Sequence, residues 1–122
     1  MRAKKGLAAV LRNRGLVLQA EGKKKEALEK YRRALELEPE NAATNNNIGA
    51  IAFQDLRWEE AERWFREALR INPRHAEAHN NLGAALEMQG KHEEAISHYE
   101  WALEIKPDYA SASENLKRVR AR

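Results

Sequence analysis

Residues 76–109 read AEAHNNLGAALEMQGKHEEAISHYEWALEIKPDY, and the same pattern of small, aromatic and proline residues occurs twice before them. Proline stands at Pro39, Pro73 and Pro107, so each proline follows the last by 34 residues. Other residue types keep this step: Gly15, Gly49 and Gly83; Ala27, Ala61 and Ala95; Ala34, Ala68 and Ala102; Tyr31, Phe65 and Tyr99. Such a regular spacing indicates an internal repeat.

The repeat divides the chain of 122 residues without leaving room for a second domain. We expect a basic leader at 1–7, three units at 8–41, 42–75 and 76–109, and a closing segment at 110–122. Within each unit, apolar residues recur every three or four positions and no run alternates, which predicts an all-α protein.

Each unit is predicted to be a helical hairpin. In the third unit we expect one helix over 76–89, a left-handed turn residue at Gly90, and a second helix over 92–105 that stops before Pro107. A hairpin of this size cannot bury its apolar side alone, so the units should be stable only when they stack on one another.

The repeat resembles the tetratricopeptide repeat, whose unit carries large-x2-Leu-Gly-x2-Tyr, then Ala-x3-Phe, Ala and Pro. The third unit matches through Leu82-Gly83, Ala95, Tyr99, Ala102 and Pro107. The resemblance covers residues 8–109 and implies a right-handed α-α superhelix of seven helices, with 110–121 as a capping helix. Three residues depart from the family pattern: Arg14, Leu56 and Glu62.

The resemblance also implies that the first helices of the units line a concave, peptide-binding groove. Asparagine recurs there at Asn13, Asn47, Asn81 and Asn115, again 34 residues apart. An asparagine amide can accept from and donate to one peptide unit, so such a column can hold the backbone of an extended peptide. The candidate peptide-binding residues are Arg12, Asn13, Asn46, Asn47, Phe53, Asn80, Asn81, Met88 and Asn115.

This asparagine column resembles the ladder in the repeat domain of O-linked N-acetylglucosamine transferases. A different interpretation stays open, in which the asparagines bond a neighbouring repeat or only water. A second family device, the carboxylate clamp for chaperone C-termini, is poorly matched, because its places read Arg12, Leu16, Asn47, Glu77 and Asn81. We expect Glu77 to repel a terminal carboxylate, so Glu-Glu-Val-Asp peptides should bind weakly.

Enzymatic chemistry finds no support in the sequence. The chain has no cysteine, no glycine-rich phosphate loop and no GxSxG motif. His75 and His79 are four residues apart, but no third ligand follows at metal spacing. We therefore expect no catalytic residue, metal, cofactor or small-molecule substrate. No apolar run approaches the roughly 18 residues of a membrane span and no export signal is recognisable, so we expect a cytoplasmic protein without membrane contact.

Charge leaves two alternatives to the peptide scaffold. Residues 1–33 hold eleven basic and three acidic residues, whereas 34–107 hold seven basic and fourteen acidic ones. A basic first unit could attract nucleic acid or an acidic partner, although aromatic residues are not interleaved with its lysines and arginines, which argues against nucleic acid. The other alternative is a structural or synthetic array with no evolved ligand. Trp64 and Trp101 are further expected to face outward, where they would allow self-association. An alternative stays open, in which Trp64 covers the gap left by Glu62 and Trp101 lies across a helix groove.

Overall fold

Seven helices make up most of the computed structural model, which describes residues 2–122, with side chains from Lys4 onward. They are α1 (Arg2–Ala20), α2 (Lys24–Leu37), α3 (Ala42–Gln54), α4 (Trp58–Ile71), α5 (Ala76–Met88), α6 (His92–Ile105) and α7 (Ala110–Arg120). Residues 2–122 contain no strand, so the predicted all-α repeat fold with seven helices is confirmed. Within this range, no helix has the length and apolar character needed to cross a membrane.

The first helix starts earlier than the repeat pattern indicates. We predicted a separate leader over 1–7, but α1 is continuous from Arg2, so residues 2–7 extend the first helix of repeat 1. Met1 lies outside the described residues. The leader is therefore one more turn and a half of helix rather than a distinct segment.

The turn inside each hairpin needs a residue in the left-handed region. Gly22 and Gly90 occupy it with φ of 80° and 81°, and Leu56 occupies the same place in repeat 2 with φ of 64°. A side chain is disfavoured in this conformation, so Leu56 is locally strained. Each hairpin then ends two residues before Pro39, Pro73 or Pro107, as expected for a residue that cannot continue a helix.

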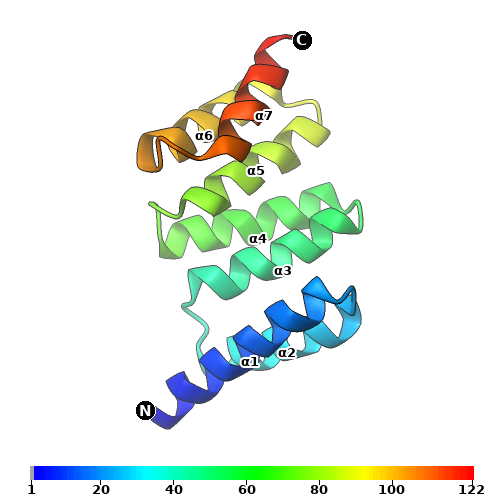
Figure 1. Ribbon diagram of the computed structural model, residues 1–122, viewed down its shortest axis with the longest axis vertical. Helices are drawn as coiled ribbons and strands as arrows, with labels where there is room; N and C mark the ends of the chain where they lie inside the picture. Colours follow the sequence, from blue (N-terminus) through cyan, green and yellow to red (C-terminus); the bar gives the residue numbers. More distant parts are fainter. Residues whose placement is uncertain (1) are drawn as a thin grey trace.

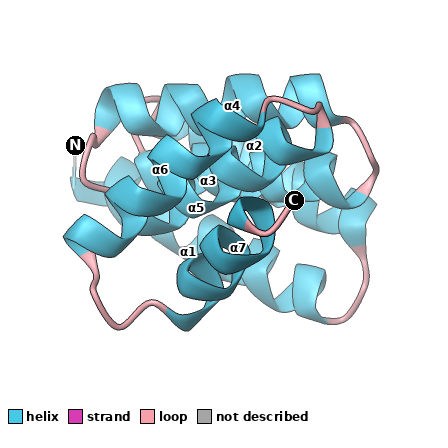
Figure 2. Cartoon of the chain, turned by 90° about the horizontal axis from the view of Figure 1, so that it is seen from above, coloured by secondary structure: helices cyan, strands magenta, loops and turns pink. Residues whose placement is uncertain are grey.

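The hairpins stack along the long axis of the molecule, from repeat 1 near the N-terminus to α7 near the C-terminus (Figure 1). Seen along this axis, the helices form two layers (Figure 2). One layer contains α1, α3, α5 and α7, which we call the first-helix layer, and the other contains α2, α4 and α6. Within the stack, α4 packs on α5 and α6 packs on α7.

Glycine allows the two helices of a hairpin to approach closely. A Cβ atom placed on Gly83 would lie 2.6 Å from Cε1 of Tyr99, and one on Gly49 would lie 2.6 Å from Cε1 of Phe65. Neither ring can move away, because both aromatic side chains are fully buried. The repeated glycine and the repeated aromatic residue are therefore two halves of one contact.

The apolar core is not continuous along the stack. One cluster joins repeats 2 and 3 with α7 and includes Phe65, Leu82, Tyr99 and Leu116. A separate cluster at the junction of repeats 1 and 2 is built on Ala27, Tyr31, Ile48 and Ile51. A third, small cluster lies inside repeat 1. Repeat 1 is thus joined to the rest of the molecule by its own small core.

Candidate functional site: the first-helix layer

The first-helix layer brings the asparagines of successive repeats next to one another. In this layer α3 contacts α5, and α5 contacts α7. The facing positions of successive repeats are offset by one residue, so the position of Asn81 and Asn115 meets the position of Asn46 and Asn80 in the preceding repeat. Asparagines at these positions can therefore bond from one repeat to the next.

Two amide pairs cross the junctions of the layer. Nδ2 of Asn81 on α5 donates to Oδ1 of Asn46 on α3 at 3.0 Å. Nδ2 of Asn115 on α7 donates to Oδ1 of Asn80 on α5, also at 3.0 Å. In each pair the donor keeps one free N–H and its carbonyl oxygen, because an asparagine amide has two donor hydrogens and one acceptor oxygen.

Asn46 and Asn80 differ from the expectation that they lie on an open groove surface. Their exposed fractions are only 3% and 5%, because the helix of the next repeat covers them. Asn80 is further occupied by Ser111, whose Oγ accepts from Nδ2 at 3.2 Å. These two residues hold their neighbours in place and are not themselves available to a ligand. The interpretation in which an asparagine bonds a neighbouring repeat therefore applies to both, and also to Asn81 and Asn115, the two members of the column that donate to them.

The remaining members of the asparagine column are more accessible. Asn47, Asn81 and Asn115 are partly exposed, and Asn13 is exposed. Among the described residues, neither Asn13 nor Asn47 has a side-chain hydrogen bond to another residue. The column thus keeps accessible amide groups that bond no other residue of the described chain.

The first junction lacks an amide pair because its sequence differs. Arg12 stands where repeats 2 and 3 carry Asn46 and Asn80. One guanidinium nitrogen of Arg12, Nη1, is buried and lacks a hydrogen-bond partner in the described part of the chain. A buried donor without a partner is costly, so the first junction is less well satisfied than the two that carry an amide pair.

Two apolar candidates flank the column. Met88 at the end of α5 is 53% exposed. Phe53 on α3 is partly buried, and its ring meets the ring of Trp58 edge-on, with 4.8 Å between centroids. Met88 therefore offers exposed apolar surface, whereas Phe53 offers a ring that is held against Trp58.

Glu87 is a structurally important residue that does not stand out in the sequence. Its carboxylate accepts from the hydroxyl of Tyr99 at 2.8 Å and from Nη2 of Arg118 on α7 at 2.8 Å. Burial alone would raise the pKa of Glu87, but the hydrogen bonds from Arg118 and Tyr99 outweigh it and hold the pKa below its usual value. Glu87 thereby anchors the end of the first-helix layer as an ionised group.

The two tryptophans lie in different surroundings. Trp101 is 54% exposed, as expected for an outward-facing residue, and its ring stacks on His79. Trp64 differs from the prediction, because it is partly buried against the core cluster of Ile48 and Ile51. Its indole packs against the same cluster as Leu28 of α2, at the junction between repeats 1 and 2.

His75 and His79 both take part in structural contacts. Nδ1 of His75 accepts from the backbone N–H of Ala78 and caps α5. Nε2 of His79 is 2.8 Å from the carbonyl oxygen of Pro73, and its Nδ1 is 3.1 Å from Nδ1 of His98. All three contacts support the third repeat.

Stacked antiparallel hairpins in two layers, with a 34-residue period, define an α-helical solenoid. Sequence comparison identifies the solenoid. A model of the tetratricopeptide repeat matches residues 40–108, and a second model of this repeat matches residues 8–41. The chain belongs to the tetratricopeptide repeat family. None of the curated proteins matches it in sequence.

Solved tetratricopeptide domains superpose on almost the whole chain. The first such domain of Spaghetti (RPAP3), bound to the HSP90 peptide SRMEEVD, is 27% identical, with a TM-score of 0.90 over 96% of this chain and 93% of that chain. The second domain of human RPAP3, in complex with the HSP70 peptide SGPTIEEVD, is 25% identical, with a TM-score of 0.88 over 98% and 99%. An O-GlcNAc transferase from Thermobaculum terrenum is also similar, with 25% identity and a TM-score of 0.91 over 95% of this chain and 22% of that chain.

Proposed function

We propose that this protein is a non-enzymatic scaffold that holds an extended segment of a partner protein along its first-helix layer. Tetratricopeptide domains of similar structure bind peptides of HSP90 and HSP70, which supports a protein or peptide ligand. The asparagine column supplies the chemistry for such a ligand in this chain.

The observation that carries the proposal is the pair of amide hydrogen bonds across the layer. Oδ1 of Asn46 accepts from Nδ2 of Asn81, and Oδ1 of Asn80 accepts from Nδ2 of Asn115, at 3.0 Å in both cases. These bonds hold the side chains of Asn81 and Asn115 in place. A fixed amide loses little side-chain entropy when a ligand binds, so its remaining donor and acceptor are preorganised for a peptide unit. In this arrangement Asn46 and Asn80 are positioning residues.

The spacing of the layer suits an extended chain. If neighbouring first helices lie about 10 Å apart, one step matches about three residues of extended peptide at ~3.3 Å each. Asn47 and Asn81 form the central rungs and Asn13 and Asn115 the outer ones, with Phe53 and Met88 as apolar contacts. The ligand would then span roughly ten residues, and a few hydrogen bonds of about 0.5–1.5 kcal/mol each give binding of micromolar strength.

Arg12 makes the two ends of the proposed groove chemically different, which would set the direction of the bound peptide. The Arg12 side chain is partly exposed at the repeat 1 end, where its guanidinium group can turn toward an acceptor of the ligand. A backbone carbonyl or an acidic side chain of the peptide would serve. We therefore place the more acidic end of the bound segment near Arg12.

The proposal is tested with peptide arrays and the variant Asn47→Ala/Asn81→Ala. Loss of about tenfold or more in affinity is expected, since two rungs that bond peptide backbone are removed. Asn72→Ala, in the loop after α4, is the matched control and should bind as the unaltered protein does. Equal binding by the double variant, with an unchanged helical spectrum, would contradict the proposal.

A further inference from the structure

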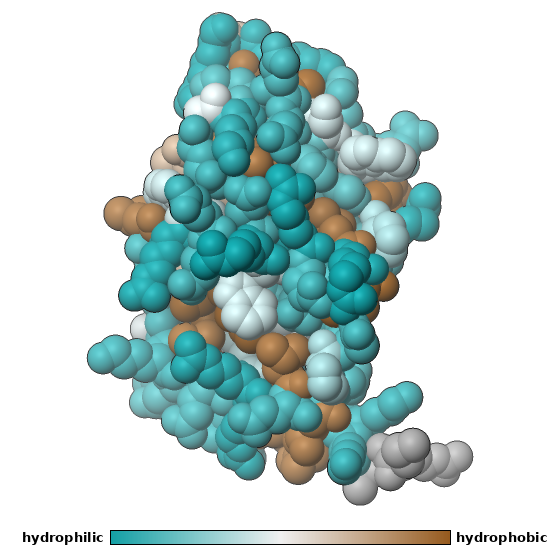
Figure 3. Space-filling view, turned by 180° about the vertical axis from the view of Figure 1, so that it is seen from behind, coloured by the Kyte–Doolittle hydropathy of each residue, from teal (hydrophilic) through white to brown (hydrophobic). Residues whose placement is uncertain are grey.

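One face of α1 exposes apolar residues at the repeat 1 end of the stack. Val10 and Val17, seven residues apart on this helix, are 50% and 58% exposed. They line a groove of about 510 Å³ together with Asn13, Arg14 and Leu18 on α1 and Glu26 and Lys30 on α2, which we call the α1 groove. In the space-filling view from behind, brown apolar surface reaches this end of the molecule among teal side chains (Figure 3).

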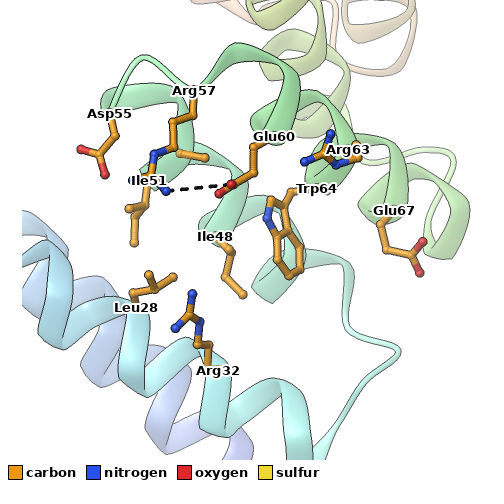
Figure 4. Close-up of a pocket in the computed structure, with 11 residues that line it drawn as sticks. Leu28, Arg32, Ile48, Ile51, Asp55, Arg57, Glu60, Arg63, Trp64 and Glu67 are labelled. Carbon is orange, nitrogen blue, oxygen red and sulfur yellow. Dashed lines mark ion pairs between the residues drawn. The ribbon is translucent and has the colours of Figure 1, made fainter.

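The helical positions of Val10, Arg14 and Val17 are buried in each later first helix. Their counterparts have exposed fractions of 7% or less and are Thr44, Ile48 and Ile51 on α3, Ala78, Leu82 and Ala85 on α5, and Ala112, Leu116 and Val119 on α7. In each case the second helix of the preceding repeat packs on the first helix: α2 on α3, α4 on α5 and α6 on α7. Figure 4 shows this contact at the first junction, where Leu28 of α2 faces Ile51 of α3. Among the four first helices that the structure describes, only α1 therefore lacks a covering helix at these positions.

Two of the covering helices share one apolar pattern. At the first junction α2 contributes Ala27, Leu28, Tyr31 and Leu35 to the core that contains Ile48 and Ile51 of α3. At the last junction α6 contributes Ala95, Ile96, Tyr99 and Leu103 to the core that contains Leu116 and Val119 of α7. Both sets have the spacing i, i+1, i+4 and i+8, which places them on one side of a helix. An amphipathic helix with this stripe therefore fits the positions that are open on α1.

The charge on α1 is positive. This helix carries five basic residues and no acidic residue. Arg14 is exposed and lies between Val10 and Val17, at a position that is apolar in the later repeats. The α2 side of the groove adds Glu26 and Lys30, whose charges are opposite. An acidic ligand is therefore electrostatically favoured, whereas a second copy docked through the same face would bring two basic helices together.

We propose that the α1 groove binds an acidic amphipathic α-helix of a partner protein, packed as a second helix packs on the next repeat elsewhere in the stack. The apolar stripe of this helix would cover Val10 and Val17, and a carboxylate beside the stripe would pair with Arg14. Of the asparagine column, only Asn13 lines this groove. The site is therefore separate from the central rungs Asn47 and Asn81 and can be tested without them.

The test uses a fluorescein-labelled synthetic peptide with the sequence of residues 92–105 as the acidic helix. This segment is α6, which has four glutamates and neither lysine nor arginine, and which covers α7 within the molecule. Fluorescence anisotropy should show binding of micromolar strength that weakens as salt is added. The matched peptide of residues 24–37, from α2, has the same stripe but five basic and three acidic residues, and should bind at least about fivefold more weakly. Equal binding of the two peptides, or no binding of the acidic one, would overturn the proposal.

Substitutions on α1 locate the binding. Val17→Asp should weaken binding of the acidic peptide about tenfold or more, because it places a like charge on the apolar stripe. Leu56→Asp is the matched control, since Leu56 is 69% exposed and lies outside the groove, and it should bind as the unaltered protein does. Arg14→Glu should also weaken binding. Full binding by a folded Val17→Asp or Arg14→Glu variant would overturn the proposal.

Two further measurements separate this site from other occupants and from the peptide groove. Asn47→Ala/Asn81→Ala should bind the acidic helix unchanged, so loss of binding in this variant would place the helix on the asparagine column instead. Sedimentation velocity without peptide should show a monomer. A dimer that Val17→Asp dissociates would show that a second copy covers the groove, and would overturn the proposal.

Discussion

The hydroxyl of Tyr99 donates a hydrogen bond of 2.8 Å to Oε1 of Glu87. When the residues at these two positions are compared between repeats, both differ together. In repeat 1 Tyr31 donates to Oε1 of Gln19 at 2.7 Å. In repeat 2 phenylalanine stands at both places, as Phe65 and Phe53. A buried hydroxyl needs an acceptor, so a tyrosine at this position is accompanied by a polar residue twelve positions earlier.

Tyr99→Phe is expected to destabilise the protein by about 1.5–3 kcal/mol, because hydrogen bonds to a charged group are strong and Glu87 stays buried. Tyr31→Phe is the matched control. It should cost about 0.5–1.5 kcal/mol, since Gln19 is neutral and water can reach it. Chemical denaturation of both variants measures the difference, and equal losses would show that the charge of Glu87 is unimportant here.

Acidification is expected to weaken the third repeat through His79 and His98. The Pro73 carbonyl can only accept, so neutral His79 donates from Nε2 and its Nδ1 accepts from Nδ1 of His98. Burial, with the nearby charges of His79 and Arg66, lowers the pKa of His98 to about 4, and burial also lowers the pKa of His79. The unfolded chain therefore takes up these protons first, and the stabilisation is complete above pH 6.5 and is lost as the pH falls toward 4.

Thermal melts at about pH 7 and about pH 5.5 test this expectation, because ordinary carboxylates remain largely ionised in that range. The melting temperature of the unaltered protein should fall on acidification. His79→Leu/His98→Gln should show a smaller fall. Parallel shifts in both proteins would assign the pH dependence to other groups.

Leu56→Gly is expected to stabilise the protein by about 1 kcal/mol, or roughly 4 °C in melting temperature. Leu56 has φ of 64° and is 69% exposed, so glycine removes backbone strain and sacrifices little buried surface. The reverse change, Gly90→Leu, should lower the melting temperature by a similar amount. A fall on Leu56→Gly would mean that the side chain contributes packing that outweighs the strain.

Peptides ending in Glu-Glu-Val-Asp should bind this protein poorly. Leu16 is 46% exposed where the clamp pattern needs a polar residue, and Glu77 is exposed where it needs a cation. Glu77→Lys should therefore raise affinity for such a peptide in fluorescence polarisation. Glu93→Lys on α6 makes the same charge change elsewhere and should have little effect. An equal gain in affinity from both variants would show that the net charge of the protein, and not the position of Glu77, determines binding.

The period of 34 residues was sufficient to predict the hairpins, because each apolar or small residue at a repeated position meets the same kind of neighbour. Gly83 and Tyr99 illustrate this, since the partner can be recognised in the same unit. Contacts between units were harder to predict. Asn46 and Asn80 share a position with Arg12, and only the packed structure shows that the asparagines are covered while Arg12 lacks a partner atom.

The sequence left two interpretations of Trp64 open for the same reason, and the outward-facing one is wrong because the indole is partly buried. Its surroundings depend on Leu28 of the preceding repeat, whereas a column-wise comparison considers each position by itself. Leu28 and Trp64 pack on one apolar cluster at the first junction, whereas Glu62 bonds Arg66 and Gln89 at the second. Comparing residue pairs across successive repeats would have shown this difference.

The division of the apolar core gives the molecule a weak end. Repeats 2 and 3 with α7 share one cluster, while repeat 1 is attached through Ala27, Tyr31, Ile48 and Ile51. Arrays of this kind unfold according to the strength of each nearest-neighbour interface. Amide hydrogens of α1 and α2 should therefore exchange with deuterium sooner than those of α4 and α5, and the array should fray from repeat 1 onward.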